Sequence, residues 1–216
     1  MEKLIICGLG VRVPQETTLE SLQALADCRV VYSDLEDKKG RAWLAGYCKS
    51  LKVPSSAAAV LKDAAKGGIG LAVWGNPQSS SRLAREVELG AQKAGLSYRV
   101  LGAISPIGSV FARSVSFLGG DYGYQGIQSY DLETVLDDAK AATTELPLVL
   151  YAERGAPAKW KAALKRLEAG YPSGHKARLY APEGESEAAL SALKPGDRCV
   201  ILIPPAKPLT ARRTKW

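Results

Sequence analysis

Short apolar runs and longer amphipathic stretches alternate along the first hundred residues of the chain. Each apolar run has the length of a buried strand and stops at a glycine or a serine, which favour turns. Each longer stretch carries apolar side chains on one face, and the first of them follows Thr17 and Thr18, either of which can cap a helix. The pattern predicts strands at 4–7, 30–32, 71–74 and 98–101, and helices at 19–26, 41–47, 57–65 and 81–94. Such alternation favours an α/β fold with a mostly parallel, open sheet.

The pattern changes beyond residue 114. Ser105-Pro106 is expected to open a further helix, and a glycine-rich stretch follows it. We therefore place a domain boundary there, with an N-terminal α/β domain at 1–114 and a C-terminal α/β domain at 115–216. In the second domain the pattern predicts strands at 148–151, 177–180 and 199–203, and helices at 131–142, 157–169 and 186–192.

Composition narrows the class of protein. The 216 residues are 46% hydrophobic and 24% charged, which is ordinary for a globular protein. The formal net charge of +7 is scattered, without basic stretches interleaved with aromatic residues, so we expect no nucleic-acid partner. No apolar run approaches the roughly 20 residues of a membrane span, so we expect no membrane partner. Four cysteines without paired spacing and a single histidine predict no metal site and a cytoplasmic location.

Three loops rich in small residues follow three of the expected strands. They are 8–10 (Gly-Leu-Gly), 75–77 (Gly-Asn-Pro) and 102–105 (Gly-Ala-Ile-Ser). Ligands of open α/β sheets bind outside the carboxyl ends of the strands, and small residues let the backbone approach them closely. Any one of these glycines can simply turn the chain, but three such loops favour a shared ligand site.

Other nucleotide-binding and hydrolase signatures fit poorly. The first loop departs from the dinucleotide fingerprint, because Val13 stands where a third Gly or Ala belongs and Pro14 delays the helix, although Asp34 is placed to bind a ribose. The sequence contains no P-loop. His175 lies in a polar turn and is expected to be exposed, which argues against a Ser-His-Asp hydrolase.

The order of several motifs resembles the tetrapyrrole methylase superfamily over nearly the whole chain. The motifs are 5–10 (Ile-Ile-Cys-Gly-Leu-Gly), 18–20 (Thr-Leu-Glu), 26–32 (Ala-Asp-Cys-Arg-Val-Val-Tyr), 73–77 (Val-Trp-Gly-Asn-Pro) and 101–105 (Leu-Gly-Ala-Ile-Ser). The last two look like the family's Gly-Asp-Pro and Pro-Gly-Ile-Ser loops. Asn76 replaces the usual acid of the first, and Gly102-Ala103 replaces Pro-Gly in the second.

Within that superfamily the chain looks most similar to the borosin-type peptide backbone N-methyltransferases. The pointers include 74–77 (Trp-Gly-Asn-Pro), 126–131 (Gly-Ile-Gln-Ser-Tyr-Asp), 148–151 (Leu-Val-Leu-Tyr), 178–180 (Arg-Leu-Tyr) and the distinctive 203–206 (Ile-Pro-Pro-Ala).

The resemblance implies a two-domain fold with a mostly parallel N-terminal sheet, a mixed C-terminal sheet and S-adenosylmethionine in a cleft between the domains. It also implies a homodimer. An aromatic face beside the sulfonium is physically reasonable, although Trp74 reads equally well as a core aromatic at a strand end. The cofactor contacts would come from Gly8, Gly10, Trp74, Asn76, Ser79, Ser105, Pro106, Ala152, Tyr180, Cys199 and Val200.

One departure bears on catalysis. Borosin-type enzymes carry a stretch with Tyr and Arg before the third strand, whereas residues 48–57 here contain neither. A backbone amide is a very weak acid, so its methylation needs a positioned base or strong oxyanion stabilisation. The catalytic candidates that the sequence offers instead are Tyr47, Tyr122, Tyr124, Tyr130 and Arg41, with Arg113 as a second charge partner.

Three hypotheses follow. The sequence prediction is that the chain N-methylates the backbone of a peptide supplied as a separate chain. The alternatives are that it methylates a tetrapyrrole or another small molecule, or that it is a relative that binds S-adenosylmethionine without catalysis. The missing Tyr/Arg stretch favours the second and third hypotheses, and the borosin-like second half favours the first.

Overall fold

The computed structural model describes residues 2–114, 126–138, 142–152, 157–181 and 184–206. They form two compact units, Met1–Ser109 and Val110–Trp216, and each has its own sheet. Helix α5 (Pro106–Ser114) contains the division between the units. The sequence-derived boundary at residue 115 stays a prediction.

The first unit is built on a parallel sheet, as the sequence predicts, but the sheet has five strands where four were expected. Its strands lie in the order β3-β2-β4-β1-β5. The first, fourth and fifth strands were expected closely where they occur, but β3 has only two residues and carries no periodic signal. The bounds are β1 (Leu4–Gly8), β2 (Val30–Ser33), β3 (Leu51–Lys52), β4 (Ile69–Val73) and β5 (Tyr98–Leu101).

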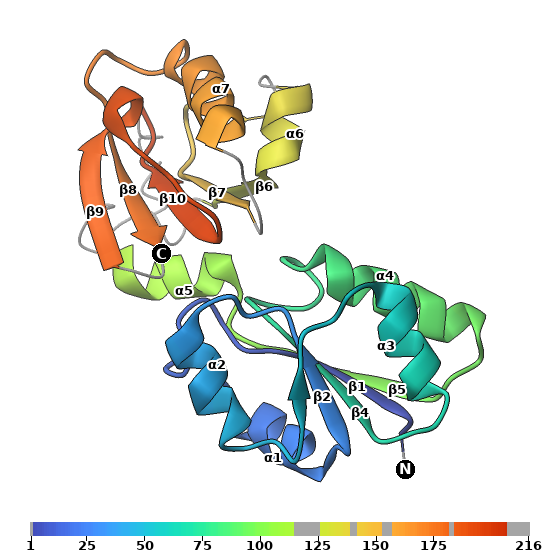
Figure 1. The fold of residues 1–216 in the computed structure, drawn as a ribbon. Coiled ribbons are helices and arrows are strands. Elements are labelled where there is room, and N and C mark those ends of the chain that lie inside the picture. The colour runs from blue at the N-terminus through green and yellow to red at the C-terminus, as the bar shows by residue number, and fades with distance from the viewer. Residues whose placement is uncertain (1, 115–125, 139–141, 153–156, 182–183, 207–216) are drawn as a thin grey trace, which may run out of the picture. The chain divides into compact units, whose positions relative to one another are not determined.

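Four helices cover this sheet. Helices α1 and α2 lie on one face and α3 and α4 on the other (Figure 1). Each begins after a residue whose side chain accepts a hydrogen bond from the first turn, and Thr18 does so for α1. The bounds are α1 (Leu19–Asp27), α2 (Lys38–Ala45), α3 (Ala57–Ala64) and α4 (Arg82–Lys93).

Burial on both faces explains the apolar runs of the central strands. Leu4, Ile6, Ile69 and Leu71 are completely buried where β1 and β4 pair in the middle of the sheet. A parallel sheet that is covered on both sides has no wet face, so its strands are continuously apolar rather than alternating.

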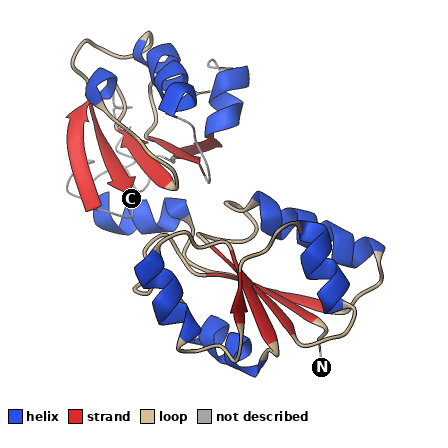
Figure 2. Cartoon of the chain, in the orientation of Figure 1, coloured by secondary structure: helices blue, strands red, loops and turns tan. Residues whose placement is uncertain are grey.

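The second unit contains a mixed sheet (Figure 2), which confirms the expected fold class. The strand order is β6-β7-β10-β8-β9, with β6 and β7 parallel and the other pairs antiparallel. Helices α6 and α7 pack with β7, β8 and β10 around the fully buried Trp160. The bounds are β6 (Gln128–Asp131), α6 (Leu132–Asp137), β7 (Leu148–Ala152), α7 (Pro157–Glu168), β8 (Lys176–Ala181), β9 (Gly184–Ala189), the 3-10 turn η3 (Leu190–Ala192) and β10 (Cys199–Ile203).

The structure corrects three expectations in this unit. The expected helix at 186–192 is wrong over residues 186–189, which belong to β9 and pair with β8, where Glu187 forms ion pairs with Lys176 and Arg178. Only Leu190–Ala192 are helical, as the 3-10 turn η3. Helix α6 ends at Asp137, five residues before its expected end. His175 is half-buried rather than exposed, and its Nε2 lies 2.8 Å from the Pro204 carbonyl oxygen.

Within the described part of the chain, no helix combines the length and apolar character needed to cross a bilayer.

Replacing Trp160 with alanine should destabilise the second unit strongly. The side chain is fully buried and its indole N–H donates to the Gly196 carbonyl at 2.9 Å. We expect a loss of about 3–5 kcal/mol in the free energy of unfolding, measured by urea denaturation with circular dichroism. Leu19→Ala is the control, since Leu19 is 77% exposed and its loss should cost under about 0.5 kcal/mol. Equal effects of the two variants would contradict this assignment of the core.

Candidate functional site

The carboxyl ends of β1 and β4 lie side by side at the switch point of the first sheet. After β1 the chain leaves to α1 on one face, and after β4 it leaves to α4 on the other. Such a switch point is where open α/β sheets bind their ligands. Here the two loops are tied by a backbone bridge, in which Gly75 N donates to Gly10 O at 2.9 Å and Gly10 N donates to Gly75 O at 3.2 Å.

Three loops converge on Gly8, the last residue of β1. A Cβ atom added at Gly8 would lie 2.3 Å from the Gly75 carbonyl oxygen, 2.6 Å from Ala103 Cβ and 2.8 Å from Pro77 Cδ. Backbone atoms cannot yield at such distances, so only glycine fits here. Gly8 thereby brings the three predicted loops into contact. Its contact with the cofactor stays a prediction.

The side chain of Asn76 joins two of these loops. Its Nδ2 donates to the Ala103 carbonyl at 2.8 Å, and its Oδ1 accepts from Gln78 N at 3.0 Å. Ser80 completes the turn, because its Oγ accepts from Asn76 N at 2.8 Å. Asn76 therefore holds the loop after β4 against the loop after β5, and its amide group is occupied by protein.

Trp74 is a core aromatic, which is one of the two readings that the sequence left open. It is 3% exposed, its indole Nε1 donates to the Val11 carbonyl at 3.1 Å, and its backbone N donates to Asp34 Oδ1 at 3.3 Å. The ring thus links the loop after β4 to the loop after β1, and the backbone N–H of Trp74 links it to Asp34 after β2.

The remaining predicted residues of the first unit form the outer rim of the loops. Ser79 is exposed and Ser105 is half-buried. Ser105 precedes α5 and its Oγ accepts from Gly108 N at 3.1 Å, while Pro106 takes the first helical position that the sequence predicted.

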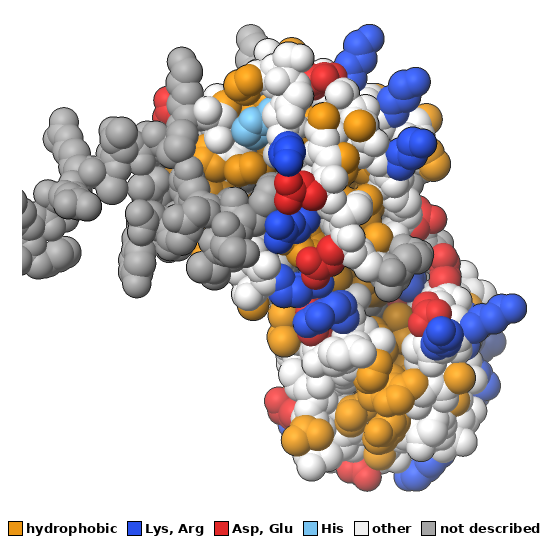
Figure 3. Space-filling model, turned by 90° about the vertical axis from the view of Figure 1, so that its left-hand side faces the viewer, with side chains coloured by type: hydrophobic (Ala, Val, Ile, Leu, Met, Phe, Trp, Pro, Cys, Tyr) orange, Lys and Arg blue, Asp and Glu red, His pale blue; other side chains and the backbone are white. Residues whose placement is uncertain are grey.

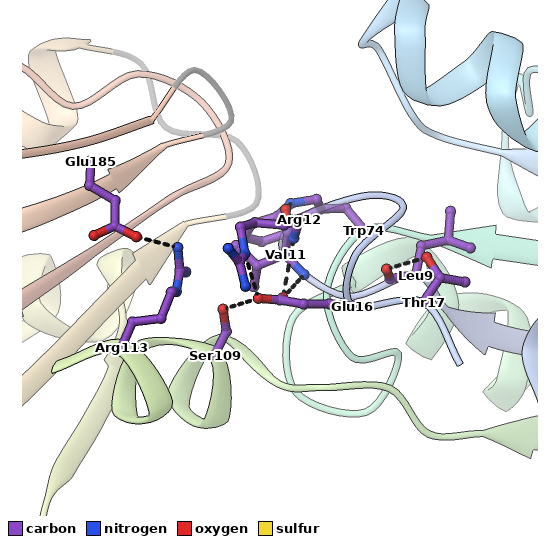
Figure 4. Close-up of polar contacts among 9 residues, drawn as sticks. All are labelled: Leu9, Val11, Arg12, Glu16, Thr17, Trp74, Ser109, Arg113 and Glu185. Carbon is purple, nitrogen blue, oxygen red and sulfur yellow. Dashed lines mark hydrogen bonds and ion pairs between the residues drawn. The ribbon is translucent and has the colours of Figure 1, made fainter. Parts of the chain in front are cut away.

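Glu16 is a site residue that sequence reasoning missed. Its side chain is 4% exposed, and its carboxylate accepts from Val11 N, Arg12 N, Arg12 Nε and Ser109 Oγ at 2.9, 3.2, 3.0 and 2.6 Å (Figure 4). Gly10 makes room for it, because Gly10 has a φ of +79° and a Cβ there would lie 2.4 Å from Glu16 Cβ. The carboxylate thereby closes the loop after β1 and fastens it to Ser109.

The electrostatics of Glu16 follow from these contacts. Burial disfavours its ionised form, but the hydrogen bonds from Ser109, Arg12 and Val11 outweigh burial, so the pKa of Glu16 lies below its ordinary value of 4.5. The group is therefore an anion that orders the loop and a weak base.

The predicted cofactor residues of the second unit lie together on neighbouring strands. Cys199 pairs with Ala152, and Val200 pairs with Tyr180, at one end of β7, β10 and β8. Tyr180 is 1% exposed, and its hydroxyl lies 2.5 Å from Ser114 Oγ. Arg113 covers the Tyr180 ring, with its guanidinium carbon 4.6 Å from the ring centroid, and pairs with Glu185 at 2.7 Å.

The described catalytic candidates of the first unit, Tyr47 and Arg41, contact other residues rather than each other. Tyr47 is 45% exposed after α2, and its ring lies 5.1 Å from that of Trp43. Arg41 donates through Nε to the Leu35 carbonyl at 3.0 Å. Tyr130 lies in β6 of the other unit. Tyr122 and Tyr124 fall outside the described residues.

Comparisons with known proteins identify the family. The family model for tetrapyrrole (corrin/porphyrin) methylases matches residues 3–182. The chain belongs to the tetrapyrrole methylases. It is therefore a methyltransferase that uses S-adenosylmethionine, as the sequence predicted. The closer likeness to borosin-type enzymes, the homodimer and the cytoplasmic location stay predictions.

Two solved structures share the fold of this tetrapyrrole methylase. The methyltransferase CobJ is 17% identical, with 94% of each chain covered and a TM-score of 0.65. The uroporphyrin-III C-methyltransferase from Thermus thermophilus, complexed with S-adenosylhomocysteine, is 16% identical, with 93% of this chain and 96% of that chain covered and a TM-score of 0.70. No curated protein matches the chain.

Neutralising Glu16 should lower stability in a pH-dependent way. We expect Glu16→Gln to cost about 1–3 kcal/mol near neutral pH, since it leaves buried donors poorly paired. Because the pKa of Glu16 is lowered on folding, its contribution is complete above 4.5 and is lost as the pH falls through the lowered value. The difference between wild type and variant in urea denaturation should shrink accordingly. Glu20→Gln, on the exposed first turn of α1, is the control, and a pH-independent difference would refute this role for Glu16.

Proposed function

We propose that S-adenosylmethionine lies outside the carboxyl ends of β1, β4 and β5. The fit rests on the outer rim of the loops, where Ser79 and Gly102 are exposed. A Cβ at Gly102 would meet no atom nearer than 4.0 Å, so there is room beside the backbone. Backbone groups of these loops, with the Ser79 and Ser105 hydroxyls, would hold the polar parts of the cofactor. When bound, the cofactor offers a sulfonium methyl group that a nucleophile of the acceptor takes up.

The described loop side chains act mainly to hold the site in shape. Asn76, Trp74 and Glu16 are each engaged with protein partners. Their fixed positions preorganise the backbone that would contact the cofactor, so little ordering is needed on binding.

We also propose that the acceptor is a tetrapyrrole-type small molecule whose own electrons suffice for attack. The three tyrosines of the described first unit are poorly placed as bases. Tyr32 donates to Asp63 at 2.6 Å, and chiefly this hydrogen bond raises the Tyr32 pKa, which makes its ionisation harder. Tyr47 is exposed after α2. Tyr98 is the first residue of β5, so it lies at the amino end of the strand, away from the loops at the carboxyl ends. An electron-rich ring carbon needs less help from a base than a peptide amide does.

Methylation of a peptide backbone supplied in trans is the second candidate. Its strongest pointer is the 203–206 motif, Ile-Pro-Pro-Ala. In the structure this motif stabilises the chain after β10. The Pro204 carbonyl oxygen is hydrogen-bonded to His175 Nε2, and Ala206 N donates to Thr144 O at 2.8 Å. A motif that closes a strand is needed whatever the acceptor is, so it supports the fold more than the peptide substrate.

The acceptor can be tested directly. The full chain is incubated with S-adenosylmethionine and either a reduced uroporphyrin or a panel of peptides encoded beside its gene, and products are read by mass spectrometry. We expect methylated tetrapyrrole and unmodified peptide. Methylated peptide without methylated tetrapyrrole would reverse the order of the two candidates, and cofactor binding without any product would favour a non-catalytic relative.

Filling the space at Gly102 should block the cofactor without unfolding the chain. Gly102 has no left-handed φ and no close neighbour, so Gly102→Leu is tolerated by the backbone but projects beyond the strand ends. We expect calorimetry to show at least a tenfold loss of affinity for S-adenosylhomocysteine. Gly196→Leu is the matched control, since Gly196 in the second unit is also unhindered. Equal affinity in both variants would place the cofactor elsewhere.

A further inference from the structure

A groove opens beside α2 and the edge strand β3 of the first unit. Its volume is about 420 Å³, which lies in the range of small-molecule sites. Three lysine or arginine side chains line it together with a serine and a wall of small apolar residues. The lining residues are Ser33, Lys38, Arg41, Ala42, Ala45, Leu51, Lys52 and Val53.

The charges that line this groove all have one sign. Lys38, Arg41 and Lys52 are cationic, and no carboxylate is among the lining residues. Within the described part of the chain, none of the three forms an ion pair with an acidic side chain. The pKa of Asp63 in α3 is lowered chiefly by the hydrogen bond from Tyr32, and the charge of Lys52 adds to this. The nearby Asp37 accepts from Lys39 N at 3.2 Å and Gly40 N at 2.6 Å, so its carboxylate is directed to the start of α2. Like charges gathered in a hollow are best stabilised by an anion from outside.

Arg41 and Ser33 make the groove more than a solvated row of lysines. Arg41 is half-buried, and its Nε and Nη2 both donate to the Leu35 carbonyl oxygen, which fixes the guanidinium and leaves its Nη1 side for a ligand. Ser33 is 1% exposed at the end of β2, and its Oγ accepts from Leu35 N at 3.3 Å. An orderly guanidinium and a buried hydroxyl suit a carboxylate, whose two oxygens accept several hydrogen bonds.

The apolar wall indicates the rest of the ligand. Ala42, Ala45 and Leu51 line the groove beside the cations, and Val53 is 59% exposed at its rim. Apolar side chains also gather on the α1 and α2 side of the first unit, which faces the viewer in Figure 3. An anion with an apolar body, rather than an inorganic ion, complements a surface of this kind.

The groove lies at the carboxyl ends of its strands, the same end of the sheet as the proposed cofactor site. Ser33 is the last residue of β2, Val53 follows β3, and β2 pairs directly with β4 in a parallel sheet. We propose that the groove binds a carboxylate-bearing arm of a small-molecule ligand through Lys38, Arg41 and Lys52. Its role as the acceptor's subsite rests on the proposed function, whereas its binding of carboxylates does not.

The test compares two doubly neutralised variants of the full chain. Lys38→Gln/Lys52→Gln removes two exposed charges from the groove. Lys62→Gln/Lys93→Gln removes two exposed charges from α3 and α4, on the other face of the sheet, and changes the net charge equally. Uroporphyrin III, a polycarboxylate, is the probe, and its binding is followed by fluorescence. Calorimetry with S-adenosylhomocysteine reports independently on the fold and on the cofactor site.

We expect the groove variant to bind uroporphyrin at least about tenfold more weakly than wild type, with a shallower salt dependence. The α3–α4 variant should stay within about twofold of wild type. Both should bind S-adenosylhomocysteine as wild type does.

The outcomes separate the two proposals. This inference would be overturned if wild type did not bind uroporphyrin or if both variants lost binding equally. It would also be overturned if polyglutamate, a polycarboxylate without an apolar ring, bound the groove more tightly than uroporphyrin does. If only the groove variant loses uroporphyrin binding, the groove proposal is upheld. If in addition the wild-type chain binds no S-adenosylhomocysteine, the proposed cofactor site is overturned while the groove proposal stands.

Discussion

The candidate site of this tetrapyrrole methylase depends on the absence of a side chain at Gly8. The loops after β1, β4 and β5 approach so closely there that Gly75 O, Ala103 Cβ and Pro77 Cδ would all lie within 2.8 Å of an added Cβ. This convergence makes possible the Gly10–Gly75 backbone bridge. Three loops that are separated by dozens of residues in sequence thereby become one rigid edge, on which a ligand can be held by backbone groups.

Glu16 is the polar counterpart of that packing. A buried carboxylate is costly unless donors surround it, and here backbone N–H groups, a guanidinium and the Ser109 hydroxyl supply them. The loop after β1 therefore has an ordered course although it contains no helix or strand. The same hydrogen bonds lower the pKa of Glu16. Its carboxylate therefore holds the loop well but is a poor base for removing a proton from the molecule that is methylated.

Local pattern carries most of the fold but little of the site. The apolar runs predicted β1 and β4 because a covered parallel strand must be apolar on both faces. The edge strand β5 was also predicted, although Arg99 is exposed on it. Strand β9 was mistaken for a helix because it is stabilised by its pairing with β8, for example by the ion pair between Arg178 and Glu187. Such contacts between strands cannot be read from the local pattern of one segment. Glu16 was missed because its contact with Ser109 spans 93 residues of sequence, and because an Arg and a Glu four residues apart, as Arg12 and Glu16 are, do not by themselves mark a buried anion. The sequence placed Trp74 on the correct loop, but its burial depends on Val11 and Asp34.

Several loop side chains of the first unit bind other parts of the protein, and this bears on how an acceptor is selected. At the loops after β1, β4 and β5, where we propose that the cofactor binds, the polar side chains of Asn76 and Glu16 are hydrogen-bonded within the protein, so these loops present mainly backbone. Backbone groups are common to all sequences that preserve the loops, and they cannot distinguish one acceptor from another. Selectivity must come from side chains that the loops do not employ. In the described part of the first unit, the cations beside α2 and β3 are such a set, because the packing of the sheet does not require their charge. A family that keeps its loops and varies this face can retain one methyl donor while it changes acceptors.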